Sequence, residues 1–415
     1  MSAATTASGS TGAREGPDPL PAGPSRGSPD PSRPTGAPPR GSPDPSRAVG
    51  APPRGSPDPS GPSGLDEPAE LARLDPGDML GEVAGAGAQA RVALRAAQAA
   101  PLVGPLPEVV VVAGMGGSGI AGDVLTALAF GSSAVPVLAV KGDRLPAFVG
   151  PGTLLVAVSY SGGTAETMSA VEQGLAAGAR LVAVTSGGTL AELASSRGAP
   201  LVTIEGGRMP RAALWSLVVP VCSAAEAAGV LPPLSDQVGA AADALDEEAA
   251  ALGPAVPTAA NPAKQAALRL LDRLPVVWGS GQVGAVAATR FRTQCNENAK
   301  VSVVSGALPE ADHNDVMGLE GGIGPGRELV LLRDEAGEHD HDGRRIQAVL
   351  EAIVARDPVV RAAGEGPDLA RLARLTAFAD FTSTYLGIAR GVDPTPIRTL
   401  DEVKAALSAE ADPPR

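Results

Sequence analysis

The sequence is poor in aromatic residues and in cysteine. Phe, Trp and Tyr make up 2% of its 415 residues, and Cys222 and Cys295, each in a stretch of helical character, are the only cysteines. This content does not fit the disulfide framework of a small secreted protein. The opening "MSAATTASGS" lacks the basic start and apolar segment of a signal peptide, and no apolar run is long enough to cross a bilayer. We therefore expect a soluble, cytoplasmic protein.

Positive charge is also scarce. Lys and Arg number 33 against 46 Asp and Glu, which gives a formal net charge of -13. Nucleic acids and anionic membranes bind proteins mainly through Lys and Arg, so the composition predicts no nucleic-acid partner and no membrane partner. A small anionic ligand is compatible with this charge, because one binding site needs only a few local donors.

Composition divides the chain into parts. Residues 1–64 are mostly Gly, Pro, Ser, Asp and Arg, which predicts a disordered tail. Within it "RGSPDPSR" recurs with a 14-residue period from Arg26, Arg40 and Arg54, the last copy ending in Gly. Such a repeat is typical of a tolerant linker, and an interaction tail is the alternative. Beyond the tail we predict a first domain, a helical linker and a second domain, at 65–232, 233–260 and 261–415.

Apolar runs of strand length alternate with helical patterns from residue 65 onward. In the first domain the predicted strands are 108–114, 135–140, 154–159, 180–185 and 200–205, with helices at 164–178 and from about 211 to 229. In the second domain we predict helices at 261–273 and 284–298 and strands at 275–279, 300–305 and 328–333. Runs that are apolar on both faces are typical of parallel sheets covered by helices. The sequence therefore predicts an α/β fold with two doubly wound parallel-sheet domains.

Two glycine-rich loops have the G-x-G-x-x-G spacing of a dinucleotide fingerprint, at Gly114–Gly119 and Gly279–Gly284. Such a loop between a strand and a helix offers backbone amides to any anion, so it serves a sugar phosphate as well as a pyrophosphate. The alternative is a tight turn that needs glycine for packing. A dinucleotide site has an acidic residue after the second strand, and here that strand is followed by "KGD" with Lys141 first, so this position leaves both ligands open.

A third loop, "SYSGGT", places three hydroxyl side chains around two glycines. Ser159, Ser161 and Thr164 follow a predicted strand and precede a predicted helix. Hydroxyls, free amides and the start of a helix together predict a pocket for a phosphate monoester. Thr164 alone could instead cap the helix, but capping does not require the two serines.

These motifs resemble a known family when they are taken in order. "GMGGSG" (114–119), "SYSGGT" (159–164), "TSGGTLAELA" (185–194) and "GRMPRAAL" (207–214) are similar to a sugar isomerase (SIS) domain. With "NENAK" (296–300), "EADHND" (310–315) and "GVDPTPI" (391–397), the chain from about residue 66 resembles the bifunctional phosphoglucose/phosphomannose isomerases. The tail has no counterpart in them. The resemblance implies SIS-type, flavodoxin-like domains and an isomerase without cofactor or metal, which converts glucose 6-phosphate or mannose 6-phosphate to fructose 6-phosphate through an enediolate.

Isomerisation moves a proton between C1 and C2 of the sugar, which one carboxylate can do. The resemblance makes Glu297 this base, whereas the residues alone favour a surface Glu paired with Lys300. The residues that we expect to hold the substrate phosphate are Gly117, Ser118, Ser159, Ser161 and Thr164.

Further roles follow from the resemblance. His313 would open the sugar ring, because imidazole titrates near neutrality and can donate and accept protons there. In the family this histidine comes from the partner subunit, so the resemblance also implies a homodimer. Arg211 would stabilise the enediolate; otherwise it is an exposed cation at a helix start, which is unfavourable without an anion. Lys404 corresponds to a lysine near the ring oxygen, or is a plain surface residue. Thr395 resembles a residue linked to tolerance of both C2 epimers.

The sequence also allows a metal site and a function without catalysis. "EHDHDG" (338–343) has the composition of a metal site, but adjacent loop residues rarely converge on one ion, so we expect a solvated acidic loop. A non-catalytic sugar-phosphate sensor could share the same domains. It would need the hydroxyl loop but neither Glu297 nor His313, and it would usually carry a DNA-binding segment, for which the tail has no pattern.

Overall fold

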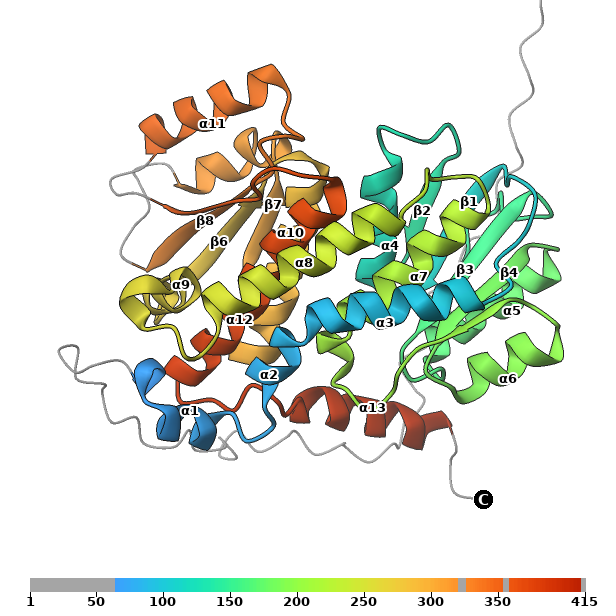
Figure 1. Cartoon of the computed structure of the whole chain (residues 1–415), viewed down its shortest axis with the longest axis horizontal. Coiled ribbons are helices and arrows are strands. Elements are labelled where there is room, and N and C mark those ends of the chain that lie inside the picture. Colours follow the sequence, from blue (N-terminus) through green and yellow to red (C-terminus); the bar gives the residue numbers. More distant parts are fainter. Residues whose placement is uncertain (1–63, 320–325, 354–357, 412–415) are drawn as a thin grey trace, which may run out of the picture. The chain divides into compact units, whose positions relative to one another are not determined.

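Two parallel β-sheets form the framework of the described part of the chain (Figure 1). The computed structural model describes residues 64–319, 326–353 and 358–411, so the predicted disordered tail and its repeat lie outside the described residues, apart from Gly64. The strand orders are β2-β1-β3-β4-β5 and β7-β6-β8-β9, and every pair is parallel. Both sheets thus begin with the flavodoxin-like order, and the predicted fold class is confirmed.

The strands of the first sheet are β1 (Val109–Gly114), β2 (Val137–Val140), β3 (Thr153–Ser159), β4 (Arg180–Thr185) and β5 (Leu201–Thr203). Those of the second sheet are β6 (Leu274–Gly279), β7 (Val304–Ala307), β8 (Arg327–Arg333) and β9 (Val359–Ala362). The helices are α1 (Pro68–Leu74), α2 (Met79–Ala84), α3 (Ala86–Ala99), α4 (Gly116–Ala129), α5 (Ala165–Ala176), α6 (Gly188–Ser196), α7 (Leu214–Ala227), α8 (Ser235–Leu252), α9 (Pro262–Leu270), α10 (Gly281–Gln294), α11 (Asp340–Ile353), α12 (Asp368–Ala389) and α13 (Arg398–Ala411). The short turns are η1 (Gly64–Asp66), η2 (Pro210–Ala212), η3 (Thr258–Ala260), η4 (Cys295–Ala299), η5 (Glu310–Asp312) and η6 (Asp315–Leu319).

Two predicted elements need correction. The strand predicted at 300–305 is β7, which pairs with β6 only from Val304, because Lys300 adopts a left-handed backbone (φ 56°) that ends the preceding turn. The helix predicted from residue 211 is divided into the short turn η2 and the helix α7, because Ala213 between them is not helical. Neither β9 nor α12 was predicted.

The core lies on both faces of each sheet, because alternate residues of a strand point to opposite sides. In β1, Val110 and Val112 pack with α4 and α7, whereas Val111 and Ala113 pack with α5 and α6. A single hydrophobic cluster contains residues of both sheets and of α3, α7, α8, α10 and α12. Helix α8, in the predicted linker, packs against α3 and α12. The proposed domain boundaries stay a prediction.

Both cysteines belong to this core. Cys222 lies in α7 and Cys295 begins η4, and both are buried free thiols. Burial raises the pKa of the Cys222 thiol to about 12, and it also raises the pKa of Cys295. The two thiols therefore stay protonated and act as small apolar side chains.

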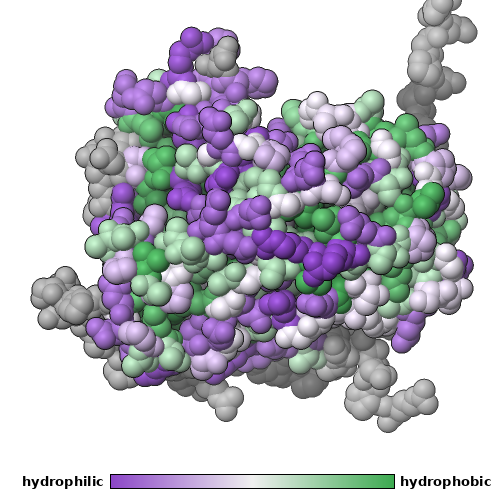
Figure 2. Space-filling view, viewed as in Figure 1, coloured by the Kyte–Doolittle hydropathy of each residue, from purple (hydrophilic) through white to green (hydrophobic). Residues whose placement is uncertain are grey.

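The face shown in Figure 2 carries hydrophilic side chains over α3 and α8. Arg91 of α3 forms ion pairs of 2.7 Å with Asp243 and Asp246 of α8. These pairs are exposed and contribute little to stability, so the apolar contacts beneath them hold the two helices together. Across the described ranges, no helix combines the length and apolar character of a membrane span.

Candidate active site

Two of the predicted loops meet at the carboxyl ends of β1 and β3. In the strand order β2-β1-β3-β4-β5, the connection from β1 leads to one side, toward β2, and the connection from β3 leads to the other side, toward β4. Ligands of open α/β sheets bind at such a switch point between two neighbouring strands. Helix α4 begins at Gly116 in the first loop, and Ser118 Oγ accepts a hydrogen bond of 3.3 Å from the backbone N of Tyr160. The fold thus brings Gly117 and Ser118 beside the "SYSGGT" loop.

The three hydroxyls of that loop lie together. Ser159 Oγ and Thr164 Oγ1 are 2.9 Å apart, and Ser159 Oγ also accepts from the backbone N of Gly162 at 3.1 Å. Ser161 is exposed, and its Oγ accepts from Gly163 N at 3.4 Å. Thr164 occupies the N-cap position of α5, but its side chain makes no capping hydrogen bond. Capping therefore does not account for this hydroxyl.

Glycines allow a third loop to pack against these hydroxyls. Gly162 has a φ of +73°, and a Cβ on it would lie 1.8 Å from the carbonyl oxygen of Gly187. Gly188 has a φ of +69°, and its Cβ would lie 2.6 Å from the carbonyl oxygen of Ser161. Any side chain at either position would push the loops apart, which explains one glycine in each motif, Gly162 and Gly188.

The second G-x-G-x-x-G loop, after β6, is filled by the protein itself. A Cβ on Gly279 would lie 2.0 Å from the carbonyl oxygen of Gly284. Ser280 Oγ donates to the carboxylate of Glu338 and accepts from the backbone N of Asp334 at 3.1 Å. Asp334 is in turn paired with Arg371 at 2.6 Å. The protein's own carboxylates lie at the start of α10, where an anion would bind, so the tight-turn interpretation fits this loop.

Glu297 lies in a π turn at the end of α10. This helix starts at the carboxyl edge of the second sheet and runs back over about 21 Å, so η4 lies toward the amino edge. The Glu297 side chain is 32% exposed, and its Oε2 lies 3.8 Å from Arg211 Nη1. Lys300 Nζ donates to the backbone carbonyl of Glu297 rather than to the carboxylate. The surface pair of Glu297 with Lys300 is therefore not formed.

Arg211 connects Glu297 to the first glycine loop. Its side chain is only 3% exposed, and Pro210 beside it lies against that loop, since a Cβ on Gly117 would be 3.3 Å from the Pro210 carbonyl oxygen. Burial lowers the pKa of the Arg211 guanidinium and the charge of Glu297 opposes this effect. The group stays charged near neutrality, because the ordinary pKa of Arg lies far above it. The exposed-helix-start interpretation of Arg211 is wrong.

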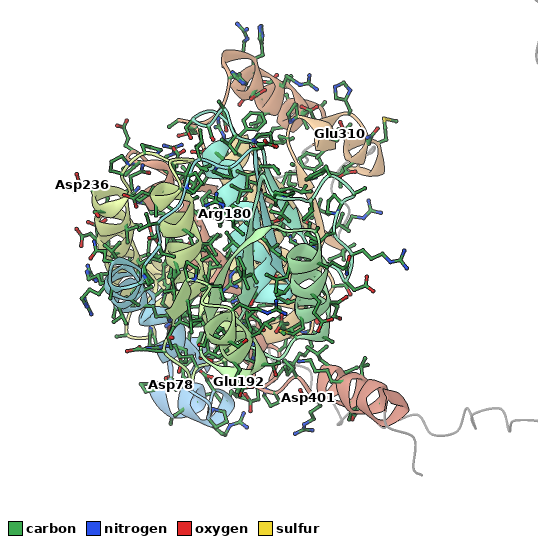
Figure 3. All side chains as sticks on the ribbon, turned by 90° about the vertical axis from the view of Figure 1, so that its right-hand side faces the viewer. Asp78, Arg180, Glu192, Asp236, Glu310 and Asp401 are labelled. Carbon is green, nitrogen blue, oxygen red and sulfur yellow. The ribbon has the colours of Figure 1, made fainter. Side chains whose placement is uncertain are left out.

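His313 lies at the other edge of the second sheet. It follows β7, whose carboxyl end is paired with that of β6, and it is exposed. Its backbone N donates to Glu310 O at 3.0 Å, and Figure 3 shows Glu310 near the top, whereas Glu192 of α6 and Asp401 of α13 lie near the bottom. The path of α10 therefore places Glu297 and His313 of one chain toward opposite edges of the second sheet.

Two other predicted residues lie near the C-terminus. Lys404 is exposed on α13. Thr395 contributes its carbonyl oxygen to Arg211 at 2.7 Å, and its buried hydroxyl oxygen has no hydrogen-bond partner among the described residues.

Most of the stretch 338–343 is helical rather than a loop, although His339 and His341 are exposed as expected. Asp340 begins α11, and the Asp342 side chain accepts from the backbone N of His339 at 3.0 Å. His341 Nδ1 lies 2.7 Å from Arg344 Nη2, and Glu338 is held by Ser280. The side chains are used in starting the helix and closing the second glycine loop. The ranges that the structure describes hold no group of three or more His, Cys, Asp or Glu suited to a metal ion.

Comparison with known proteins gives consistent matches. Residues 259–407 match the family described as bacterial phospho-glucose isomerase C-terminal SIS domain. The bifunctional phosphoglucose/phosphomannose isomerase of Caldicellulosiruptor bescii is 32% identical over 311 residues, which cover 73% of this chain and 90% of that protein. The protein of the same name from Thermoplasma acidophilum is 32% identical over 299 residues, covering 72% and 89%.

Solved structures share the fold. A hypothetical protein from Thermus thermophilus aligns with a TM-score of 0.64 at 19% identity, over 83% of this chain and 94% of its own. A glucose-6-phosphate isomerase like protein from the same organism aligns with a TM-score of 0.53 at 23% identity, over 80% and 96%.

Proposed function

Because the chain belongs to the bifunctional phosphoglucose/phosphomannose isomerase family, it is an isomerase of sugar phosphates, and we propose glucose 6-phosphate and mannose 6-phosphate as its substrates, with fructose 6-phosphate as the common product. The observation that carries the proposal is the Glu297–Arg211 pair, 3.8 Å apart, beside the first glycine loop and its hydroxyl neighbour. The non-catalytic sensor, which would need neither Glu297 nor His313, is not favoured, because the relatives are isomerases.

The residues divide the chemistry between them. Gly117, Ser118, Ser159, Ser161 and Thr164 hold the phosphate with hydroxyls and with the amides at the start of α4 and α5. The Glu297 carboxylate takes the proton from C2 of the open-chain aldose and returns it to C1. The proton of the C2 hydroxyl passes to the oxygen on C1, so that C1 becomes the hydroxymethyl carbon and C2 the ketone. Between these steps the Arg211 guanidinium stabilises the negative oxygen of the enediolate, and neither residue is changed at the end of the cycle.

A coupled assay of the full chain tests the substrates. We expect comparable rates of fructose 6-phosphate formation from glucose 6-phosphate and mannose 6-phosphate, and the same rates with EDTA present, because neither Glu297 nor Arg211 needs a metal to act. Turnover of one epimer alone would contradict the dual specificity. Turnover of neither, with an active coupling enzyme, would contradict the function.

Replacement of Thr164 by Val tests the phosphate site. Hydrogen bonds to charged groups contribute about 1.5–3 kcal/mol, so we expect KM for the sugar phosphate to rise about 10- to 100-fold. The melting temperature should change little, because the Thr164 side chain does not cap α5 and Ser159, its hydrogen-bond partner, keeps its bond from Gly162 N. The exposed Thr203 of β5 provides a matched control, Thr203→Val, with unchanged KM. A lower melting temperature with unchanged KM would favour the capping role.

We also propose that the enzyme is a homodimer in which His313 reaches the site of the partner subunit and opens the sugar ring. The position of His313 toward the opposite edge of the second sheet from Glu297 supports this proposal. Lys404, on the helix that follows the Arg211-binding carbonyls, would lie near the ring oxygen. A cytoplasmic location stays a prediction.

Complementation tests the shared site. Glu297→Gln and His313→Ala homodimers should each be inactive, whereas unfolding and refolding of an equal mixture should restore about one quarter of the wild-type activity, because half of the dimers then hold one intact site. Mixtures that stay inactive although mixed dimers form would place His313 in the site of its own chain, whereas an active His313→Ala homodimer would place it outside the reaction.

A further inference from the structure

Asn298 is a buried amide between Arg211 and helix α12. Its exposed fraction is 0%, and its Nδ2 donates to Ser383 Oγ at 3.1 Å and lies 3.5 Å from Thr384 Oγ1. Its Oδ1 accepts a hydrogen bond of 2.7 Å from Arg211 Nε. Because the amide nitrogen faces the two hydroxyls of α12, the carbonyl oxygen is fixed toward Arg211.

The guanidinium of Arg211 has five N–H donors, and the protein uses those on one side. Nε donates to Asn298, and Nη2 donates to the carbonyl oxygens of Pro394 and Thr395, each at 2.7 Å. Nη1 has no hydrogen-bond acceptor within the described part of the chain, and it lies 3.8 Å from Glu297 Oε2. These three acceptors leave Nη1 as the nitrogen that faces Glu297.

The backbone of Arg211 is held by the same segment of α12. Arg290 Nη2 donates to the Arg211 carbonyl oxygen, and Arg290 pairs with both carboxylate oxygens of Asp380, at 2.8 and 2.9 Å. The backbone carbonyl of Asp380 accepts from the hydroxyls of Ser383 and Thr384. Residues 380–384 therefore hold Arg211 twice, through Arg290 and through Asn298.

We propose that Asn298 is a positioning residue for the isomerisation, which fixes Arg211 so that Nη1 points to the oxygen of the enediolate; this inference rests on the proposed function. Asn298 follows Glu297 directly in the π turn, so one residue sets the base and the cation relative to each other. A guanidinium whose other donors are occupied cannot turn toward water when charge develops on the sugar, so its stabilisation is available without rearrangement.

Asn298→Ala removes the acceptor of Arg211 Nε. A misplacement of about 1 Å in an active site costs about 100-fold in rate, so we expect kcat to fall about 100-fold while KM changes less than about threefold, because the phosphate loops are untouched. Asn296, exposed in the same turn, provides the control Asn296→Ala, for which kcat should stay within about twofold. Asn298→Asp keeps the size of the side chain but places a second carboxylate on Arg211, in competition with Glu297. Asn298→Asp is expected to lower kcat by a similar factor, and it tests the proposal in place of Asn298→Ala if that variant does not fold.

A double-mutant cycle with Arg211→Lys separates positioning from a general structural role. Lys lacks the planar fork and cannot reach Asn298 and both carbonyls at once. If Asn298 acts through Arg211, its replacement should cost less than about threefold in the Arg211→Lys background. Equal losses in both backgrounds, or a wild-type kcat in folded Asn298→Asp and Asn298→Ala, would overturn the proposal. An inactive wild type would contradict the proposed function instead, so the two failures are distinct.

Discussion

Replacement of Glu297 by Gln is expected to lower kcat by about 10⁴-fold, the upper range for loss of a general base, with little change in sugar-phosphate affinity. The amide keeps the size of the side chain but cannot accept the C2 proton. The phosphate-binding loops are on other elements and stay intact. Binding of fructose 6-phosphate by calorimetry and turnover by the coupled assay measure the two effects separately.

The matched control is Glu172→Gln, at an exposed position of α5. It makes the same chemical change outside the site and should leave kcat and affinity at wild-type values. Near-wild-type turnover in Glu297→Gln would show that another group moves the proton, and the assignment of Glu297 would then be wrong.

The second large effect is expected for Arg211→Lys, with kcat lower by about 10²- to 10³-fold, as for the loss of one preorganised donor to a developing oxyanion. The positive charge is kept, but the ammonium cannot bind Asn298, Pro394 and Thr395 together. Burial already lowers the pKa of Arg211, and the same burial would lower the pKa of a lysine there. Turnover of this variant should therefore fall further at alkaline pH, as the lysine loses its proton.

Arg95→Lys, at an exposed position of α3, controls for the change of side chain. Full activity of Arg211→Lys would mean that charge alone suffices and that the three acceptors around the guanidinium have no catalytic consequence.

The strands and the phosphate loops could be predicted because each leaves a continuous signal in the sequence. β1, β3 and β4 are buried on both faces and therefore read as unbroken apolar runs, and the loops that follow them hold the glycines and hydroxyls. Parallel strands end at one edge, so Ser118 and Ser159 could be expected to meet there without knowledge of the rest of the fold.

The part of the site around Glu297, Arg211 and Asn298 was harder to predict from the sequence. Helix α12 carries apolar residues at helical spacing, but this pattern does not show that it also buries Thr376, Asp380, Ser383 and Thr384, whose polar groups are satisfied inside the protein. The role of Asn298 depends on a π turn and on residues 85 positions away, which no local pattern reveals. Likewise, the sequence alone does not show that Glu297 and His313 lie toward opposite edges of the second sheet, because this depends on the direction of α10.

The hydrophobic cluster that runs through both sheets has a consequence for evolution and engineering. Separating the part of the chain that carries the first sheet from the part that carries the second would expose the apolar sides of α3, α7, α8 and α12 to water. Each Å² of apolar surface exposed in this way costs about 25 cal/mol of free energy. Neither half could then be exchanged as a module. Heat should melt the two sheets in a single cooperative transition, with the catalytic pair lost at the same temperature as the scaffold.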